Sequence, residues 1–243
     1  MASIFRPLDS AGEHQAMPGA AQFVDRQQAG QRLAKAVAAL QLDNPLVLAL
    51  PRGGVPVAFE VAKALHAQLD LMLVRKIGAP GHAEYAIGAL VDGPDPQVVL
   101  NDEAIEFTRP QPGYIEAETR RQLAELERRR EIYRGSHQAI PVTGRIVALI
   151  DDGIATGSTV TVALRALRKT DAKMIVLAVP VAPADVISRL RSECDRIVCL
   201  STPTDFCAVG PHYADFGQTS DQQVLALLQE AQLWMRPVEP IRP

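Results

Sequence analysis

Short apolar runs rich in Val, Ile and Leu recur along the chain, and segments with helical spacing of apolar residues separate them. Runs of this kind predict strands buried on both faces, as in a parallel sheet. The predicted strands are 46–50, 71–75, 146–150, 174–179 and 197–200, and the predicted helices between them are 55–69, 158–169 and 184–193. This alternation predicts an α/β fold with an open, mostly parallel sheet and helices on both faces.

Further helices are predicted before the first strand, at about 26–40, and after the last, at about 220–234. We therefore expect one domain over residues 21–235, an N-terminal tail at 1–20 and a tail with three prolines at 236–243. Residues 98–143 interrupt the strand–helix repeat and are interpreted as a helical insertion.

Within that insertion, residues 113–134 predict one long polar helix. Six arginines there suggest a nucleic-acid site, but five glutamates balance them, and Glu125 can pair with Arg129 one turn later. Leu123, Leu126 and Tyr133 form a narrow apolar stripe, which favours docking on the domain or on a second subunit.

Composition limits the possible partners and the compartment. Hydrophobic residues make up 47% of the 243 residues, and the formal net charge of -3 gives no overall positive field for nucleic acid. Arg6, Asp9 and Glu13 interrupt the start where a secretory signal needs an apolar stretch, and no run is long enough for a membrane helix. Three cysteines without a CxxC pair are typical of reduced thiols. We expect a cytoplasmic protein without membrane or nucleic-acid partners.

The segment RIVALIDDGIATGSTV, residues 145–160, carries the strongest chemical signal. A strand runs into two acids, then a turn rich in Gly and Thr, then a helix. Backbone amides, hydroxyl groups and the positive end of that helix form a cup for a phosphate dianion. Asp151 and Asp152 follow the strand, where open α/β sheets bind ligands, and suit sugar hydroxyls or a magnesium shell. The structural alternative is a helix cap, which needs only one acid.

This segment resembles the signature of type I phosphoribosyltransferases, which bind phosphoribosyl pyrophosphate (PRPP). The resemblance implies that Asp151 and Asp152 hold the ribose. It also implies a 5′-phosphate site made by the residues after them: Gly153, Ile154, Ala155, Thr156, Gly157, Ser158 and Thr159. In the 6-oxopurine branch an aspartate stands where this chain has Ala155, so hypoxanthine and guanine are disfavoured as acceptors.

Two earlier segments match the family in order. PRGG, with Arg52, Gly53 and Gly54, is similar to its pyrophosphate loop. Arg75 and Lys76 match a basic strand end that meets pyrophosphate, although a surface charge pair is the alternative. The residues beyond, including Gly78, Gly81 and His82, are expected to form a mobile lid.

A small variable hood is expected at 201–218, where Phe206, Tyr213 or Phe216 could stack on a base. Ordinary core packing is the alternative for these rings. His82 and Glu84 are candidates for a general base, with solvated surface residues as the alternative.

The resemblance implies transfer of a phosphoribosyl group from PRPP to a nucleobase-like acceptor, with release of pyrophosphate. Mg²⁺ would enter with PRPP, with possible help from Asp151 and Asp152, and the catalytic residues would be these two acids with Arg75 and Lys76. A homodimer is expected. The alternatives are a regulator that binds PRPP or a nucleotide without catalysis and, from the Gly/Thr turn alone, a flavin-binding loop.

Overall fold

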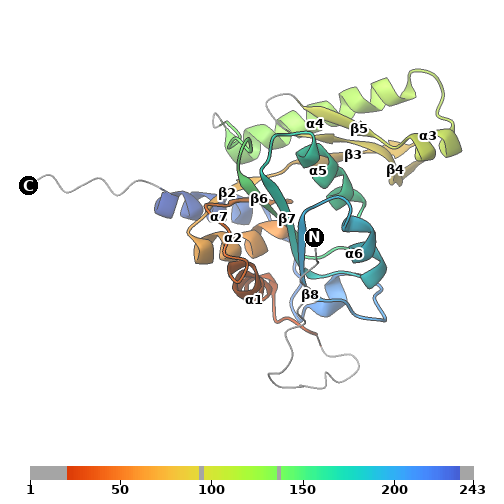
Figure 1. Ribbon diagram of the computed structural model, residues 1–243. Coiled ribbons are helices and arrows are strands. Elements are labelled where there is room, and N and C mark those ends of the chain that lie inside the picture. The colour runs from red at the N-terminus through yellow and green to blue at the C-terminus, as the bar shows by residue number, and fades with distance from the viewer. Residues whose placement is uncertain (1–20, 93–95, 136–137, 236–243) are drawn as a thin grey trace, which may run out of the picture.

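A five-stranded parallel sheet forms the centre of the computed structural model, which describes residues 21–92, 96–135 and 138–235. Its strands are β1 (Leu46–Ala49), β2 (Gln68–Leu71), β6 (Ile146–Ile150), β7 (Met174–Val181) and β8 (Arg196–Ser201), in the order β2-β1-β6-β7-β8 (Figure 1). Every pairing between neighbours is parallel. The predicted fold class is confirmed. The predicted tails at 1–20 and 236–243 lie outside the described residues.

Helices cover both faces of this sheet because successive side chains on a buried strand point to opposite sides. On β6, Ala148 and Ile150 pack on the side of α1 (Arg26–Ala38), α2 (Gly54–Leu65) and α7 (Asp221–Met235). Val147 and Leu149 pack on the side of α5 (Ser158–Arg168) and α6 (Ala184–Leu190). Figure 1 shows these two helical layers on either side of the strands.

Two predicted elements have different bounds in the structure. The helix predicted at 55–69 ends at Leu65, because His66 has a left-handed backbone with φ of 49°, and the chain enters β2 at Gln68. The strand predicted at 71–75 is divided between two sheets. β2 ends at Leu71, and β3 (Val74–Ala79) begins a separate antiparallel sheet.

That second sheet has the order β3-β4-β5, with β4 at His82–Val91 and β5 at Gln97–Leu100. The departure from the parallel repeat therefore begins at Val74, earlier than the predicted insertion at 98–143. The segment expected to form a loop after Lys76 is instead a hairpin that turns at Gly81, where φ is +74°, and its expected movement as a lid stays a prediction. α3 (Asp102–Thr108) follows β5.

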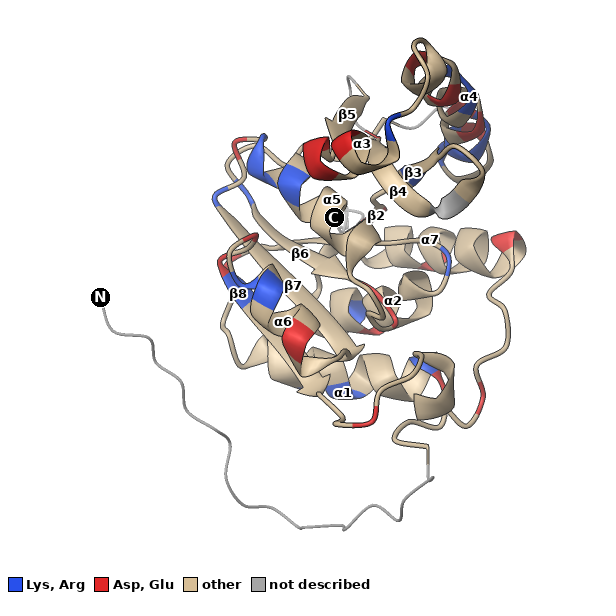
Figure 2. Ribbon diagram, turned by 90° about the vertical axis from the view of Figure 1, so that its right-hand side faces the viewer, with Lys and Arg blue, Asp and Glu red and all other residues tan. Residues whose placement is uncertain are grey.

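The long polar helix is confirmed as α4 (Tyr114–Arg134). Leu126 and Tyr133 are buried on its inner face and Leu123 packs beside them, so the apolar stripe docks on the domain itself. Acidic and basic side chains alternate along α4 (Figure 2). The predicted pair of Glu125 and Arg129 forms, with 2.9 Å between Arg129 Nε and Glu125 Oε1. Among the described helices, none is both long and apolar enough to cross a membrane.

Candidate functional site

The acidic pair follows the carboxyl end of β6, and the predicted sequence of strand, loop and helix is confirmed there. Residues 151–157 form a loop, and α5 begins at Ser158. Gly157 precedes the helix with φ of +79°, and a Cβ there would lie 2.8 Å from Val186 Cγ1. Both the backbone conformation and the space therefore require glycine at this position.

One predicted phosphate ligand is excluded by the backbone pairing. The Ile154 amide donates to the Val181 carbonyl at 2.9 Å, and its side chain is buried, so Ile154 anchors the loop to β7. Ala155 and Thr156 are exposed at the tip of the loop, and the hydroxyls of Thr156 and Ser158 lie 3.3 Å apart. Of the residues predicted to hold a phosphate, this pairing removes Ile154, and the phosphate-binding role of the others stays a prediction.

The two carboxyl groups are poorly solvated. Burial, and then the neighbouring carboxylate of Asp152, raise the pKa of Asp151 well above its usual range. Burial also raises the pKa of Asp152, although Arg26 opposes this shift. The Asp152 amide donates to Asp151 Oδ1 at 2.9 Å, which fixes the first carboxylate against the backbone. A ligand that donates hydrogen bonds or carries positive charge would stabilise the ionised form of these two carboxyl groups.

Arg26 is a functional candidate that sequence reasoning missed. Its Nε donates to Asp152 Oδ2 at 2.7 Å, its Nη1 donates to the Gly217 carbonyl at 2.6 Å, and its Cζ lies 3.9 Å from the centre of the Phe216 ring. Arg26 begins α1 and is 126 positions from Asp152 in sequence. No local pattern around Arg26 signals this contact, because only the packing of α1 on the sheet creates it.

The PRGG turn lies directly against the acidic pair. The Leu50 amide donates to the Ile150 carbonyl at 3.0 Å, which aligns the ends of β1 and β6. A Cβ at Gly53 would lie 2.1 Å from Asp152 Oδ2, and one at Gly54 would lie 2.9 Å from the Ile150 carbonyl oxygen. Two motifs about a hundred residues apart thus meet at one edge of the sheet, and glycine is required because the acids and the strand end occupy the space.

Comparisons with known proteins agree with this geometry. The family model for the phosphoribosyl transferase domain matches residues 20–215. The chain belongs to the phosphoribosyltransferase family.

Relatives of this chain include proteins of two Mycobacterium tuberculosis strains that carry phosphoribosyl transferase as a provisional name. They are 48% identical over 209 residues, or 86% of this chain and 47% of theirs, so the chain spans about half the length of these curated relatives. The crystal structure of TT1426 from Thermus thermophilus is 44% identical with a TM-score of 0.76, over 86% of this chain and 98% of that one.

The two basic residues on β3 face opposite sides of their sheet. Arg75 Nε donates to Gln122 Oε1 of α4 at 3.0 Å, and burial, then Arg129, lower the pKa of Arg75. Val74 packs in the cluster that contains the inner face of α5. Because strand side chains alternate, Lys76 lies on the α5 side with Val74, and Arg75 on the α4 side. The structure therefore separates two residues that were expected to share one ligand.

Arg52 lies in the PRGG turn, but its guanidinium is directed to α7. Its Nη1 is 3.6 Å from Asp221 Oδ1, and Asp221 also accepts a hydrogen bond from the Tyr133 hydroxyl of α4. The Arg52 and Asp221 side chains are 36% and 45% exposed, so water screens this contact and the pair is weak. Arg52 can exchange it for a ligand at small cost.

Aromatic residues of the predicted hood are engaged in packing. Tyr213 is buried, its ring centre is 5.3 Å from that of Phe23, and its hydroxyl donates to the Asp152 carbonyl. Phe216 lies between Tyr213 and Arg26, and Phe206 stacks on His212 at 5.2 Å. Core packing, the alternative interpretation, therefore accounts for these contacts. His82 is exposed at the start of β4, and the Glu84 side chain lies outside the part of the chain that the structure describes, so a general-base role for either residue stays a prediction.

Cysteine chemistry plays no visible part in this site. Cys194, Cys199 and Cys207 are all free thiols. Burial raises the pKa of both Cys194 and Cys199 to about 11, so both stay protonated and unreactive near neutral pH.

Proposed function

We propose that this protein binds PRPP at the carboxyl end of β6 and transfers its phosphoribosyl group to a nitrogen of a nucleobase-like acceptor. The observation that supports this most strongly is the contact between the PRGG turn and the acidic pair, next to a loop that leads into a helix. Residues 155–159 would hold the 5′-phosphate through amides, hydroxyls and the start of α5. Asp151 and Asp152 would accept hydrogen bonds from the ribose hydroxyls.

The acidic pair also fits a role near a divalent cation. Two carboxylates with raised pKa values lie together at one strand end, and oxygen ligands of this kind suit Mg²⁺. Bound with PRPP, Mg²⁺ would neutralise charge on the departing pyrophosphate. The chain's own contribution would be to orient the ribose and to present Lys76 and Arg52 to the pyrophosphate. Arg75 is left out of this proposal because of its place under α4.

The proposed reaction is a substitution at C1 of the ribose. The bond from C1 to the pyrophosphate oxygen breaks, and that oxygen keeps the electron pair. A bond from C1 to the acceptor nitrogen forms, and the nitrogen loses its proton to solvent. Charge that develops on the sugar ring in between would be stabilised by the two carboxylates. Arg26 would act as a positioning residue, since it holds Asp152 through a hydrogen bond of 2.7 Å.

The test is a pyrophosphate-release assay with PRPP, Mg²⁺ and single nucleobases. We expect release with at least one base and loss of release in Asp151→Asn. Hypoxanthine and guanine should be poor acceptors because the exposed Ala155 offers no carboxylate to the purine ring. Saturable PRPP binding without release for any base would replace the enzyme by a PRPP-binding regulator on the same fold. Failure to bind PRPP would reject both.

A further inference from the structure

A groove of about 480 Å³ lies between β3 and α4, and three arginines line it. Arg75 comes from β3, and Arg121 and Arg128 come from α4. Positions 121, 125 and 128 of α4 are four and then three residues apart, so their side chains share one face of the helix. None of the residues that the proposed function uses lines this groove.

Arg75 is half-buried in this groove and has no carboxylate partner among the described residues. Its Nε donates to Gln122 Oε1 at 3.0 Å, and Gln122 Nε2 in turn donates to Glu118 Oε1 at 2.7 Å. The two terminal nitrogens of Arg75 donate to no described residue, and they are not among the fully buried atoms that lack a partner. These nitrogens are therefore accessible from the groove, while Gln122 fixes the orientation of the guanidinium group.

Arg121 and Arg128 also keep donors that the protein does not use. Arg121 donates to Glu118 through Nε and Nη2, and Arg128 donates to Glu125 through the same two atoms. The Nη1 group of each arginine donates to no described residue. The two arginine side chains are 70% and 57% exposed, so water screens both pairs and the arginines can turn towards a ligand at small cost.

Positive charge exceeds negative charge around this groove. Arg129 adds a fourth guanidinium group, and because it also pairs with Glu125, one carboxylate serves two arginines. Four arginines against the two carboxylates of Glu118 and Glu125 leave a net charge of +2. Burial, and then Arg129, lower the pKa of Arg75, because its positive charge is only partly compensated. The groove therefore favours an anion, and a dianion most of all.

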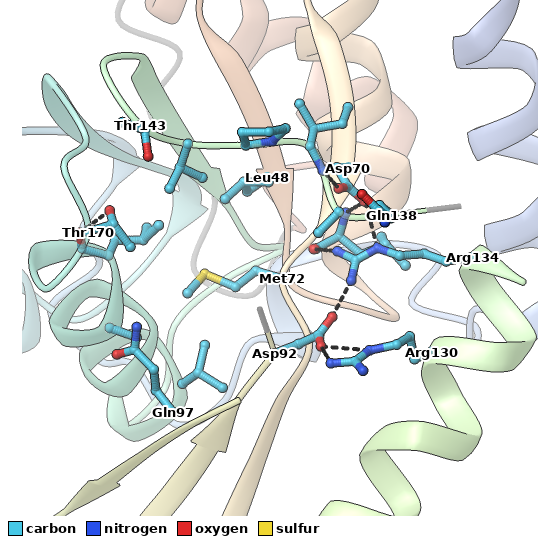
Figure 3. A pocket seen from close by; sticks show the side chains of 18 of the residues that line it. Leu48, Asp70, Met72, Asp92, Gln97, Arg130, Arg134, Gln138, Thr143 and Thr170 are labelled. Atoms are coloured by element: carbon cyan, nitrogen blue, oxygen red, sulfur yellow. Dashed lines mark hydrogen bonds and ion pairs between the residues drawn. The ribbon is translucent and has the colours of Figure 1, made fainter. Parts of the chain in front are cut away.

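The other end of α4 shows the opposite arrangement. Arg130 and Arg134 both bind the Asp92 carboxylate, whose side chain is only 2% exposed (Figure 3). The charges of these two arginines are compensated inside the protein. Arg75 is half-buried against the same helix and has no such partner. Taking a charge partly out of water without a counter-charge costs free energy, and a bound anion would recover it.

We propose that this groove binds a phosphate dianion, free or as the end group of a phosphate monoester, between Arg75, Arg121 and Arg128. Guanidinium groups donate pairs of parallel hydrogen bonds that match the oxygens of phosphate, and the net charge of +2 matches the charge of the dianion. The site is distinct from the proposed PRPP site and does not depend on it. Arg75 lies on the α4 face of its sheet, whereas Lys76, which would meet pyrophosphate, lies on the opposite face.

The test is a titration of inorganic phosphate into the full chain at constant ionic strength, followed by chemical-shift changes of backbone amides. We expect saturable shifts at Gln122 and Glu125. Arg75→Gln keeps a polar side chain and removes the charge, so it should weaken this binding about tenfold or more. Arg120→Gln is the matched control, because Arg120 is exposed on the same helix and does not line the groove. It should change the affinity less than about twofold. No saturable shift on α4, or equal losses in the two variants, would overturn the proposal.

A second variant keeps the test decisive if Arg75→Gln does not fold. Arg128→Gln changes an exposed side chain and should weaken phosphate binding in the groove about fivefold. Unchanged phosphate affinity in Arg128→Gln would overturn the proposal. Release of pyrophosphate from PRPP should be the same in Arg128→Gln as in the wild type, so failure of this proposal and failure of the proposed function give different results.

Two further readouts locate the phosphate and identify its source. Shifts at the amides of residues 155–159 report phosphate at the proposed PRPP site, and shifts confined to those amides would overturn the proposal. Phenyl phosphate, a simple monoester, is titrated in the same way. Binding on α4 as tight as that of inorganic phosphate would support the groove as a site for a monoester, and binding of inorganic phosphate alone would support it as a site for the free ion.

Discussion

Arginine lies beside buried carboxylate in two regions, the carboxyl end of the parallel sheet and the segment from β3 to α4, here called the insertion. The consequences differ between the two regions. At the sheet end, the carboxylates of Asp151 and Asp152 repel each other, and Arg26 forms an ion pair with Asp152. In the insertion, Arg130 and Arg134 surround Asp92, and Arg134 reaches Asp70 as well. The first arrangement leaves negative charge available to a ligand. The second satisfies its charges internally and holds α4 to the sheet.

This difference predicts that the insertion network matters for stability and the sheet end for binding. Arg134→Met should lower the free energy of unfolding by about 3 kcal/mol, because two buried carboxylates each lose a partner. PRPP affinity should be unchanged. Urea unfolding measures the first effect. Arg189→Met, which removes a pair with Asp185 in which both side chains are exposed, is the control and should leave the free energy of unfolding almost unchanged. Equal losses in the two variants would contradict the structural role.

Glycine substitutions sharpen the same contrast. Gly53→Ala should weaken PRPP binding by about 30-fold, or about 2 kcal/mol, because the new Cβ would lie 2.1 Å from Asp152 Oδ2 and displace that carboxylate. Gly81→Ala is the control in the insertion. It meets no atom within 4 Å but requires φ of +74°, so it should cost about 1 kcal/mol of stability and no affinity. Titration of PRPP into the two variants measures both affinities. Equal PRPP affinities in Gly53→Ala and Gly81→Ala would reject the proposed role of the PRGG turn.

Substitutions of Arg75 and Lys76 test whether these neighbours, on opposite faces of β3, have different roles. Arg75 would hold α4, and Lys76 would bind pyrophosphate. Lys76→Ala should reduce PRPP affinity about fivefold, or about 1 kcal/mol. Arg75→Ala should leave affinity unchanged and lower the melting temperature slightly, because it removes the hydrogen bond to Gln122. Calorimetry and thermal unfolding on the same samples give both quantities. A larger affinity loss in Arg75→Ala would restore its predicted role and reject the assignment of the two faces.

The pH dependence of stability should report Asp151. Its pKa is raised in the folded protein, so its contribution to stability is full below the unfolded pKa of about 3.9 and is lost as pH rises through the raised value. Asp151→Asn removes this dependence, and at neutral pH it should be as stable as the wild type or slightly more stable. Urea unfolding between pH 4 and pH 8 measures the effect. An unchanged pH slope would mean that Asp151 is not buried as a carboxylate.

Local sequence predicted the sheet end well because its structure depends on neighbours in the chain. An apolar strand, two acids and a glycine turn determine β6, the loop and the start of α5 with little help from elsewhere. The PRGG turn was found for the same reason, although its glycines are required by the acids that they contact.

The insertion was predicted less well because its contacts are distant in sequence. Nothing near Leu71 indicates that the chain leaves one sheet there and enters another three residues later, at Val74. Arg26 was missed because only the packing of α1 brings it to Asp152. Ile154 was predicted to bind the phosphate, but its amide donates to the Val181 carbonyl. This pairing depends on the position of β7 beside β6, which the loop sequence does not indicate.

Titration calorimetry of PRPP with Mg²⁺ against the wild type and Asp151→Asn tests the central claim most directly. Asparagine keeps the size of the side chain and removes the charge that would hold the ribose hydroxyls. The account predicts affinity lower by about 1 to 3 kcal/mol, or about 5- to 150-fold, in a variant that is no less stable than the wild type at neutral pH. Equal affinity in the two proteins would contradict a ribose-binding role for the acidic pair.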